Sequence, residues 1–120
     1  MEKPDVTWRI FCMYILILVL MIWAGTASAQ IQITQFNAKW NSANEVLWVN
    51  KLTDCKTISY VDISKQTKLA AKHKIAVIPT IIIFKDDVEV ARFQADLSFK
   101  MVATKEEVQE EIDNQLISDF

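Results

Sequence analysis

The stretch Trp40-Asn41-Ser42-Ala43-Asn44 precedes a run that reads as a helix, which is a position where proteins can activate a nucleophile. A thiol at a helix N-terminus has a lowered pKa, because the helix dipole stabilises the thiolate. Asparagine is not a nucleophile there. Asn41 or Ser42 can instead accept main-chain N–H groups, and Ser42 with Glu45 has the spacing of a capping box. The stretch is therefore interpreted either as a helix cap alone or as a non-catalytic binding surface beside Trp40.

The other residues that could do chemistry are Cys55, Cys12 and His73. Cys12 lies in an apolar run, so Cys55 has no disulfide partner in the rest of the chain. Cys55 precedes a predicted strand, whereas α/β proteins place their sites at the carboxyl ends of strands. We therefore expect a half-buried structural thiol. His73, near a predicted helix end, has no second histidine or cysteine nearby, so we expect no metal and no cofactor.

Composition and charge limit the class of partner. The chain has 120 residues, of which 52% are apolar, and its formal net charge is −2. Lysine and arginine form no basic stripe, and the last stretch is acidic. Phosphate contacts need clustered cations, so we expect no nucleic-acid binding. The only glycine is Gly25, which leaves no glycine-rich phosphate loop in the rest of the chain.

Much of the apolar excess lies at residues 10–24, IFCMYILILVLMIWA, which carry no charge. One interpretation is a signal peptide, cut after the small-x-small pattern Ala27-Ser28-Ala29. The other is an uncleaved membrane anchor over residues 10–29, about long enough to cross a bilayer as a helix. In both cases we expect residues 1–29 to be a signal or anchor. Residues 30–120 then form an exported domain, periplasmic or otherwise extracytoplasmic, that is either membrane-anchored or released.

Apolar patterning predicts an α/β domain. Strands are expected at residues 30–36, 56–64, 80–85 and 88–93. The second reads as a central strand because it is largely apolar, and the last two form an antiparallel hairpin that turns at Asp86-Asp87. Helices are expected from residue 42 to about 53, over 64–74, and over 104–120, where Thr104 is the cap.

The predicted helices should each bury one face. The inward residues expected are Val46, Leu47, Val49 and Leu52 in the first helix, Leu69, Ala70 and Ala71 in the second, and Val108, Ile112 and Leu116 or Ile117 in the third. Trp48 is expected to pack the first helix on the sheet. The order β-α-β-α-β-β-α then gives a mixed four-stranded sheet with helices on both faces.

Three segments in this order resemble the thioredoxin family: FNAKW at 36–40, YVDIS at 60–64 and LAAKHKIAVIPTIIIF at 69–84. The resemblance covers roughly residues 31–118, and Ile78-Pro79-Thr80 is its most specific part. It implies a minimal thioredoxin-like fold preceded by an N-terminal apolar helix. It also implies a cis peptide bond before Pro79, beside a substrate groove.

The chain departs from the family pattern in four ways. The family has Cys-x-x-Cys after its tryptophan, and Asn41 and Asn44 occupy those two cysteine positions. Gln35 stands where the family often has a buried acid that tunes proton transfer. Ala95 stands where the family has a glycine after its last strand. The first strand and helix of full thioredoxins are missing.

The resemblance with these departures implies a redox-inactive protein-binding, scaffold or chaperone-like module rather than an enzyme. Its expected partner is a protein or peptide, and the implied groove is lined by Trp40, Asn41, Asn44, Ile78 and Pro79. One alternative is a thiol-disulfide oxidoreductase that acts through Cys55 or a partner's cysteine. Another is a structural subunit of a membrane assembly.

Overall fold

The computed structural model describes residues 10, 12–15 and 29–118. The predicted signal or anchor segment lies mostly outside these residues, and so do residues 119–120 of the predicted last helix. No helix among the described residues has both the length and the apolar character needed to cross a membrane. The two interpretations of residues 1–29 therefore stay predictions, as does the boundary at residue 30.

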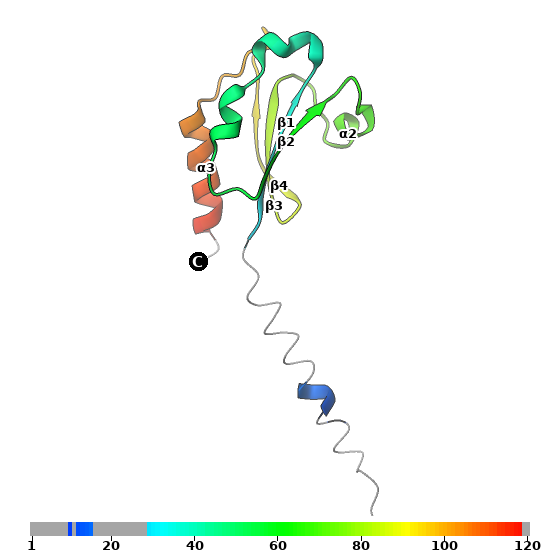
Figure 1. The fold of residues 1–120 in the computed structure, drawn as a ribbon, viewed down its shortest axis with the longest axis vertical. Coiled ribbons are helices and arrows are strands. Elements are labelled where there is room, and N and C mark those ends of the chain that lie inside the picture. Colours follow the sequence, from blue (N-terminus) through cyan, green and yellow to red (C-terminus); the bar gives the residue numbers. More distant parts are fainter. Residues whose placement is uncertain (1–9, 11, 16–28, 119–120) are drawn as a thin grey trace, which may run out of the picture.

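The core of the fold is a four-stranded mixed sheet in the order β2-β1-β3-β4 (Figure 1). Its strands are β1 (Ile31–Asn37), β2 (Thr57–Asp62), β3 (Thr80–Lys85) and β4 (Val88–Gln94). β1 pairs parallel with β2 and antiparallel with β3, which forms a hairpin with β4. This confirms the predicted fold class. The prediction that the second strand is central is wrong, because β2 is the outermost strand on its side.

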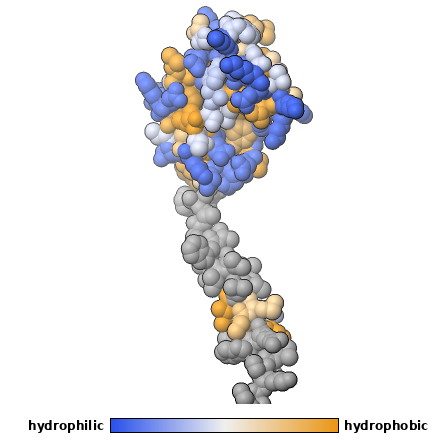
Figure 2. Space-filling view, turned by 45° about the vertical axis from the view of Figure 1, so that its right-hand side comes forward, coloured by the Kyte–Doolittle hydropathy of each residue, from blue (hydrophilic) through white to orange (hydrophobic). Residues whose placement is uncertain are grey.

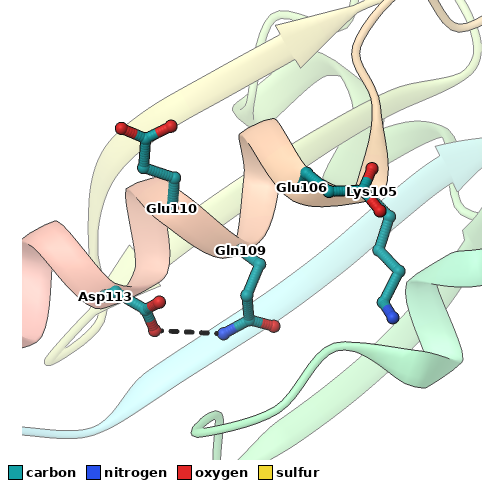
Figure 3. A pocket seen from close by; sticks show the side chains of 5 residues that line it. All are labelled: Lys105, Glu106, Gln109, Glu110 and Asp113. Carbon is teal, nitrogen blue, oxygen red and sulfur yellow. Dashed lines mark hydrogen bonds between the residues drawn. The ribbon is translucent and has the colours of Figure 1, made fainter.

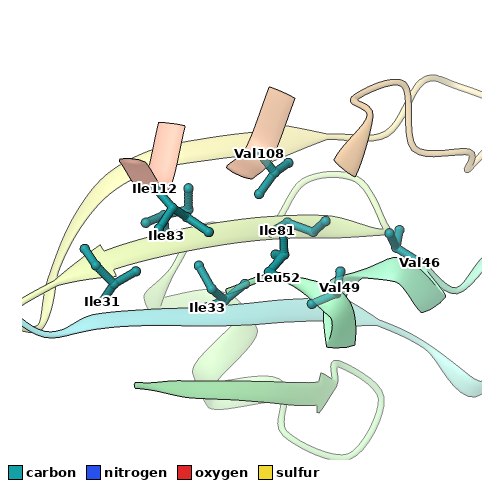
Figure 4. Packing of buried hydrophobic residues seen from close by; sticks show 9 residues of the cluster. All are labelled: Ile31, Ile33, Val46, Val49, Leu52, Ile81, Ile83, Val108 and Ile112. Atoms are coloured by element: carbon teal, nitrogen blue, oxygen red, sulfur yellow. The ribbon is translucent and has the colours of Figure 1, made fainter. Parts of the chain in front are cut away.

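The larger hydrophobic cluster lies on one face of this sheet (Figure 4). Ile81 and Ile83 of β3 are fully buried against Ile112 of α3 (Lys105–Ile117). Ile82 points to the opposite face, where it packs with Phe36 under the short helix α2 (Thr67–Lys72). The alternation of side chains along a strand thus places helices on both faces, as predicted.

The predicted first helix is wrong. Two 3-10 helices occupy its place, η1 (Lys39–Asn44) and η2 (Leu47–Lys51), and neither has a side-chain cap. Asn41 has non-helical dihedrals inside η1, φ −107° and ψ 22°. Val46 is extended between the two helices and, like Val49 and Leu52, is buried. Leu47 was predicted to point inward but is 70% exposed, whereas Trp48 packs against the core as expected.

The second helix is also shorter than predicted. The chain turns after β2, where the Asp62 side chain accepts a hydrogen bond from the Ser64 amide, so α2 begins only at Thr67. It ends at Lys72 with His73 as its C-cap, and Lys74 follows with a positive φ of 52°. Ala71 is exposed rather than buried, because so short a helix turns only a narrow face toward the sheet.

The turn of the hairpin and the N-terminal cap of the last helix are as predicted. Asp86 and Asp87 both have positive φ, as a two-residue hairpin turn requires. The Thr104 hydroxyl accepts a hydrogen bond from the Glu107 amide at 3.2 Å and caps α3. Its apolar face consists of Val108, Ile112 and Leu116, and Ile117 is exposed.

We predict that Ile112→Ala lowers the free energy of unfolding by about 2–5 kcal/mol, because it leaves a cavity between α3 and the sheet. Ile117→Ala is the matched control: Ile117 lies on the same helix but is 65% exposed, so the change should stay within about 0.5 kcal/mol. Urea unfolding followed by circular dichroism measures both. Equal losses would contradict the packing of α3 on β3.

Candidate functional site

The site lies at the carboxyl end of β1, where Gln35 ties the η1–η2 segment to the sheet. The Gln35 side chain is only 4% exposed. Its Nε2 donates to the Val46 carbonyl at 3.2 Å, and its Oε1 accepts from the Val46 amide at 2.8 Å. One amide therefore pairs both main-chain groups of Val46. A carboxylate at this position could accept from the Val46 amide but could not donate to the carbonyl.

Three asparagines continue this arrangement. Asn37, the last residue of β1, is completely buried, and its Oδ1 accepts from Asn41 Nδ2 at 3.1 Å. Asn37 Nδ2 donates in return to the Asn41 carbonyl at 3.3 Å. Asn44 Nδ2 donates to Asn41 Oδ1 at 2.9 Å. Asn37 was missed by the sequence analysis, and the only available signal was an amide at the end of an otherwise buried strand.

These contacts test the helix-cap interpretation of Asn41 and Ser42. The Asn41 side chain points inward, is 4% exposed, and also donates to the Phe99 carbonyl at 3.4 Å. Ser42 and Ala43 are exposed, and the Ser42 carbonyl accepts the hydrogen bond that closes η1. The helix-cap interpretation is therefore wrong. Asn41 and Asn44 form a buried amide network with Asn37, and none of these side chains supplies a nucleophile.

The other predicted groove residues are only partly available at the surface. The peptide bond between Ile78 and Pro79 is cis, as the resemblance implies, and both residues are buried. Thr80 pairs with Phe36, so Pro79 lies beside the end of β1 close to the amide network. Trp40 is 66% exposed, and Asn44 borders a hollow of about 330 Å³. The residues that line this hollow are Asn44, Glu45, Val46, Leu47, Trp48, Lys100 and Met101.

An aromatic pair lies over the amide network. The rings of Trp40 and Phe99 meet edge to face, with centroids 5.3 Å apart and planes at 88°. Phe99 is 41% exposed, and Leu97 on the same loop is 93% exposed. Figure 2 shows that apolar residues on the face in view lie in small groups among hydrophilic ones. Phe99 was not predicted, because it approaches Trp40 from 59 residues further along the chain.

The loop that carries Phe99 is held in shape by Asp96. Its carboxylate accepts hydrogen bonds from the Ser98 hydroxyl and from the amides of Ser98 and Lys100. The hydrogen bond from the Ser98 hydroxyl, followed by that from the Lys100 amide, lowers the pKa of Asp96. Ala95 and Met101 close the loop as a β-bridge, and Phe99 takes a positive φ of 64°. Leu97 and Phe99 therefore project from a loop whose conformation is fixed by hydrogen bonds and by a β-bridge.

Cys55 lies far from the amide network and from the Trp40–Phe99 pair. It is half-buried against the larger cluster, as predicted, and its Sγ lies 3.8 Å from the Leu52 carbonyl. Burial raises the pKa of the Cys55 thiol, the opposite of what a reactive thiolate needs. Cys55 is next to the start of β1, and the amide network is at its end. About six residues at 3.3 Å each separate them, or roughly 20 Å.

His73 lies at the C-terminal end of α2, as predicted, and it also has a packing role. Its ring lies between those of Phe36 and Phe84, with centroid distances of 5.6 and 5.3 Å. Arg92 donates to the His73 and Lys74 carbonyls and so fixes the end of α2. Within the part of the chain that the structure describes, no group of three or more histidine, cysteine, aspartate or glutamate side chains could hold a metal ion.

A separate hollow of about 280 Å³ lies along α3, lined by Lys105, Glu106, Gln109, Glu110 and Asp113 (Figure 3). Gln109 is the only one of these side chains that ties α3 to another element. It donates to the Thr53 carbonyl at 3.0 Å and accepts from the Thr53 amide at 2.9 Å. The remaining residues form a charged, solvated face.

Solved structures identify the fold, although no family model and no curated protein sequence matches the chain. A mutant thioredoxin from Halobacterium salinarum is 17% identical, covers 72% of this chain and 75% of its own, and has a TM-score of 0.57. A Schistosoma mansoni thioredoxin pre-protein is 18% identical, covers 80% of this chain and 88% of its own, and has a TM-score of 0.56. Thioredoxin-2 of the malaria parasite, a component of a protein secretion machinery, is 21% identical, covers 74% of this chain and 86% of its own, and has a TM-score of 0.55. The chain has the thioredoxin fold, without a Cys-x-x-Cys motif.

We predict that Gln35→Ala lowers the free energy of unfolding by about 2–4 kcal/mol, because it leaves two buried main-chain groups of Val46 unpaired. Gln109→Ala is a close control, since Gln109 makes the same pair of hydrogen bonds to Thr53 at an exposed position. Water can replace that side chain, so the loss should stay below about 1 kcal/mol. Urea unfolding compares the two variants, and similar losses would contradict the special role of the buried amide.

Proposed function

We propose that this thioredoxin-fold chain is a redox-inactive, exported and membrane-tethered module that binds a protein or peptide partner. The binding surface in this proposal consists of Trp40, Phe99 and Leu97, and we call it the aromatic surface. The observation that carries the proposal is the Trp40–Phe99 pair, which is exposed directly above an amide network in which Asn41 makes only structural contacts.

Redox inactivity is supported by the chemistry of the two replaced positions. Thiol-disulfide exchange needs an attacking thiolate and a second thiol to resolve the mixed disulfide. Asn41 and Asn44 supply neither, and the Gln35 amide cannot take up or release a proton as a buried acid does. The same positions instead hold η1 against β1.

Partner binding is supported by the type and setting of the exposed side chains. Tryptophan and other large aromatic residues carry much of the binding energy at interfaces, where they present a rigid apolar area. Trp40 and Phe99 come from two segments that the Asn41–Phe99 hydrogen bond joins. Export and tethering are supported by the uncharged sequence at residues 10–24 and remain part of the proposal.

We expect a photo-crosslinking residue at Leu97 to trap a partner in the cells that produce the protein. The same residue at Ile117, which is also exposed but lies at the far end of α3, should trap no such partner. Trp40→Ala should reduce the yield from Leu97 at least about tenfold, equivalent to about 1.4 kcal/mol of binding free energy.

Any of three results would overturn this proposal. Equal trapping from Leu97 and Ile117 would mean that the aromatic surface has no special role. Trapping from Leu97 that is indifferent to Trp40→Ala would mean that the contact is incidental. Partners caught only through residues 10–29 would instead support a structural subunit of a membrane assembly.

The oxidoreductase alternative makes a different prediction for Cys55, which can be measured in a Cys12→Ser variant where Cys55 is the only thiol. Because burial raises its pKa, less of this thiol is ionised at neutral pH than of a free cysteine. We expect iodoacetamide to alkylate native Cys55 at pH 7.5 at least about tenfold more slowly than the urea-unfolded chain. Faster alkylation in the native state, or a thiol-disulfide activity lost in Cys55→Ser, would favour the enzyme.

A further inference from the structure

Among the residues that the structure describes, no strand lies beside β2 at one edge of the sheet. β2 pairs with β1 on one side and ends the sheet order on the other. The Ile63 amide donates to the Asn37 carbonyl at 2.9 Å, toward β1. Main-chain groups alternate in direction along a strand, so those of Val61 and Ser59 also point to β1. Within β2, the main-chain groups of Ile58 and Tyr60 then point outward, away from the sheet. The amide of Lys56, which precedes the strand, donates to the Ile31 carbonyl at 2.7 Å.

The two edges of the sheet differ in how they are protected. Native edge strands are often blocked by bulges, inserted charges or proline. The outer strand β4 is irregular opposite Ile83 and Phe84, and it carries the Glu89–Arg92 ion pair. β2 keeps its register with β1 from Thr57 to Asp62 and contains no proline and no bulge, and a single lysine, Lys56, precedes it. The free edge of β2 is therefore open to another strand.

We propose that the free edge of β2 pairs antiparallel with β2 of a second copy of this chain, with the two Ser59 residues opposite each other. In this register, the segment from Lys56 to Asp62 is complementary to itself. Two-fold symmetry then forms each of the following pairs twice. Lys56 lies opposite Asp62, Thr57 opposite Val61, and Ile58 opposite Tyr60.

Each of these pairs favours association. Lys56 and Asp62 carry opposite charges, and Thr57 with Val61 are β-branched residues suited to a strand. Ile58 with Tyr60 is a β-branched and aromatic pair, and Tyr60 is 43% exposed in the single chain. This self-complementarity of charge and shape is what identifies the occupant as a second copy rather than an unrelated peptide.

The direction of the main-chain groups fits the same register. Ile58 of one copy lies opposite Tyr60 of the other, and both direct their main-chain groups outward, so they can exchange two hydrogen bonds. A shift by one residue would place side chains of opposite faces against each other. Centring the pair on Tyr60 would set Ile58 against Asp62 and separate Lys56 from Asp62. The Ser59-centred register is thus the favoured one.

The test uses disulfide trapping in the full-length chain, in native membranes or detergent, with Cys12→Ser and Cys55→Ser as background. In the proposed register the two Ser59 residues form a non-hydrogen-bonded pair with Cα atoms about 4.5 Å apart. That distance is within disulfide reach. Thr57→Cys is the matched control, because Thr57 is exposed on the same face of the same strand. Its symmetry mate would lie about 13 Å away, four residues along the partner strand.

We expect mild oxidation to give at least about tenfold more covalent dimer from Ser59→Cys than from Thr57→Cys. Adding Lys56→Glu to Ser59→Cys should lower that yield, since it places like charges opposite each other, whereas Lys51→Glu on η2 should not. Equal yields from the two cysteine positions, or no dimer from Ser59→Cys, would overturn the proposal. Ser59→Cys adducts with other proteins only would show that the edge takes a foreign strand and would likewise overturn it.

Discussion

The local structure around the site depends on the pairing of buried amides at the carboxyl end of β1. Gln35, Asn37 and Asn41 are almost fully buried, and among the described residues no buried side-chain nitrogen or oxygen lacks a hydrogen-bond partner. An unpaired buried amide costs about 1–3 kcal/mol, so the chain adopts a path that satisfies all of them. That path draws the Val46 main chain onto Gln35 and the Asn41 side chain onto Asn37.

The same constraint explains why the segment after β1 is not an α-helix. Val46 must be extended to present both of its main-chain groups to Gln35, and this divides the segment into η1 and η2. Two short 3-10 helices lack the aligned peptide dipoles that a continuous helix would direct at residue 41. The position therefore lacks both the thiol and part of the electrostatic environment that lowers a thiol pKa. A disturbed helix also leaves Leu47 exposed instead of buried.

Features encoded by neighbouring residues could be predicted from the sequence, and features set by distant partners could not. The Asp86-Asp87 turn and the Thr104 cap depend on adjacent residues, and both were found. The capping box at Ser42 failed because Gln35, in the preceding strand, forms hydrogen bonds with the main chain of Val46, 11 residues further on, and so holds the segment out of a continuous helix. The apolar β2 was predicted as central because the place of a strand in the sheet order leaves no mark within its own sequence. Phe99 was missed because only the folded chain brings it to Trp40.

The two proposals constrain each other through geometry. An antiparallel β2 pair places the carboxyl ends of the two β1 strands, and with them the two aromatic surfaces, at opposite ends of a continuous sheet. Such a dimer could join two partners but could not hold one small peptide with both surfaces. The two Gln30 residues lie four residues from the centre on either side, about 26 Å apart along the strands. Both copies can then be tethered to one membrane only with the strands nearly parallel to its plane, which directs the aromatic surfaces along the membrane rather than away from it.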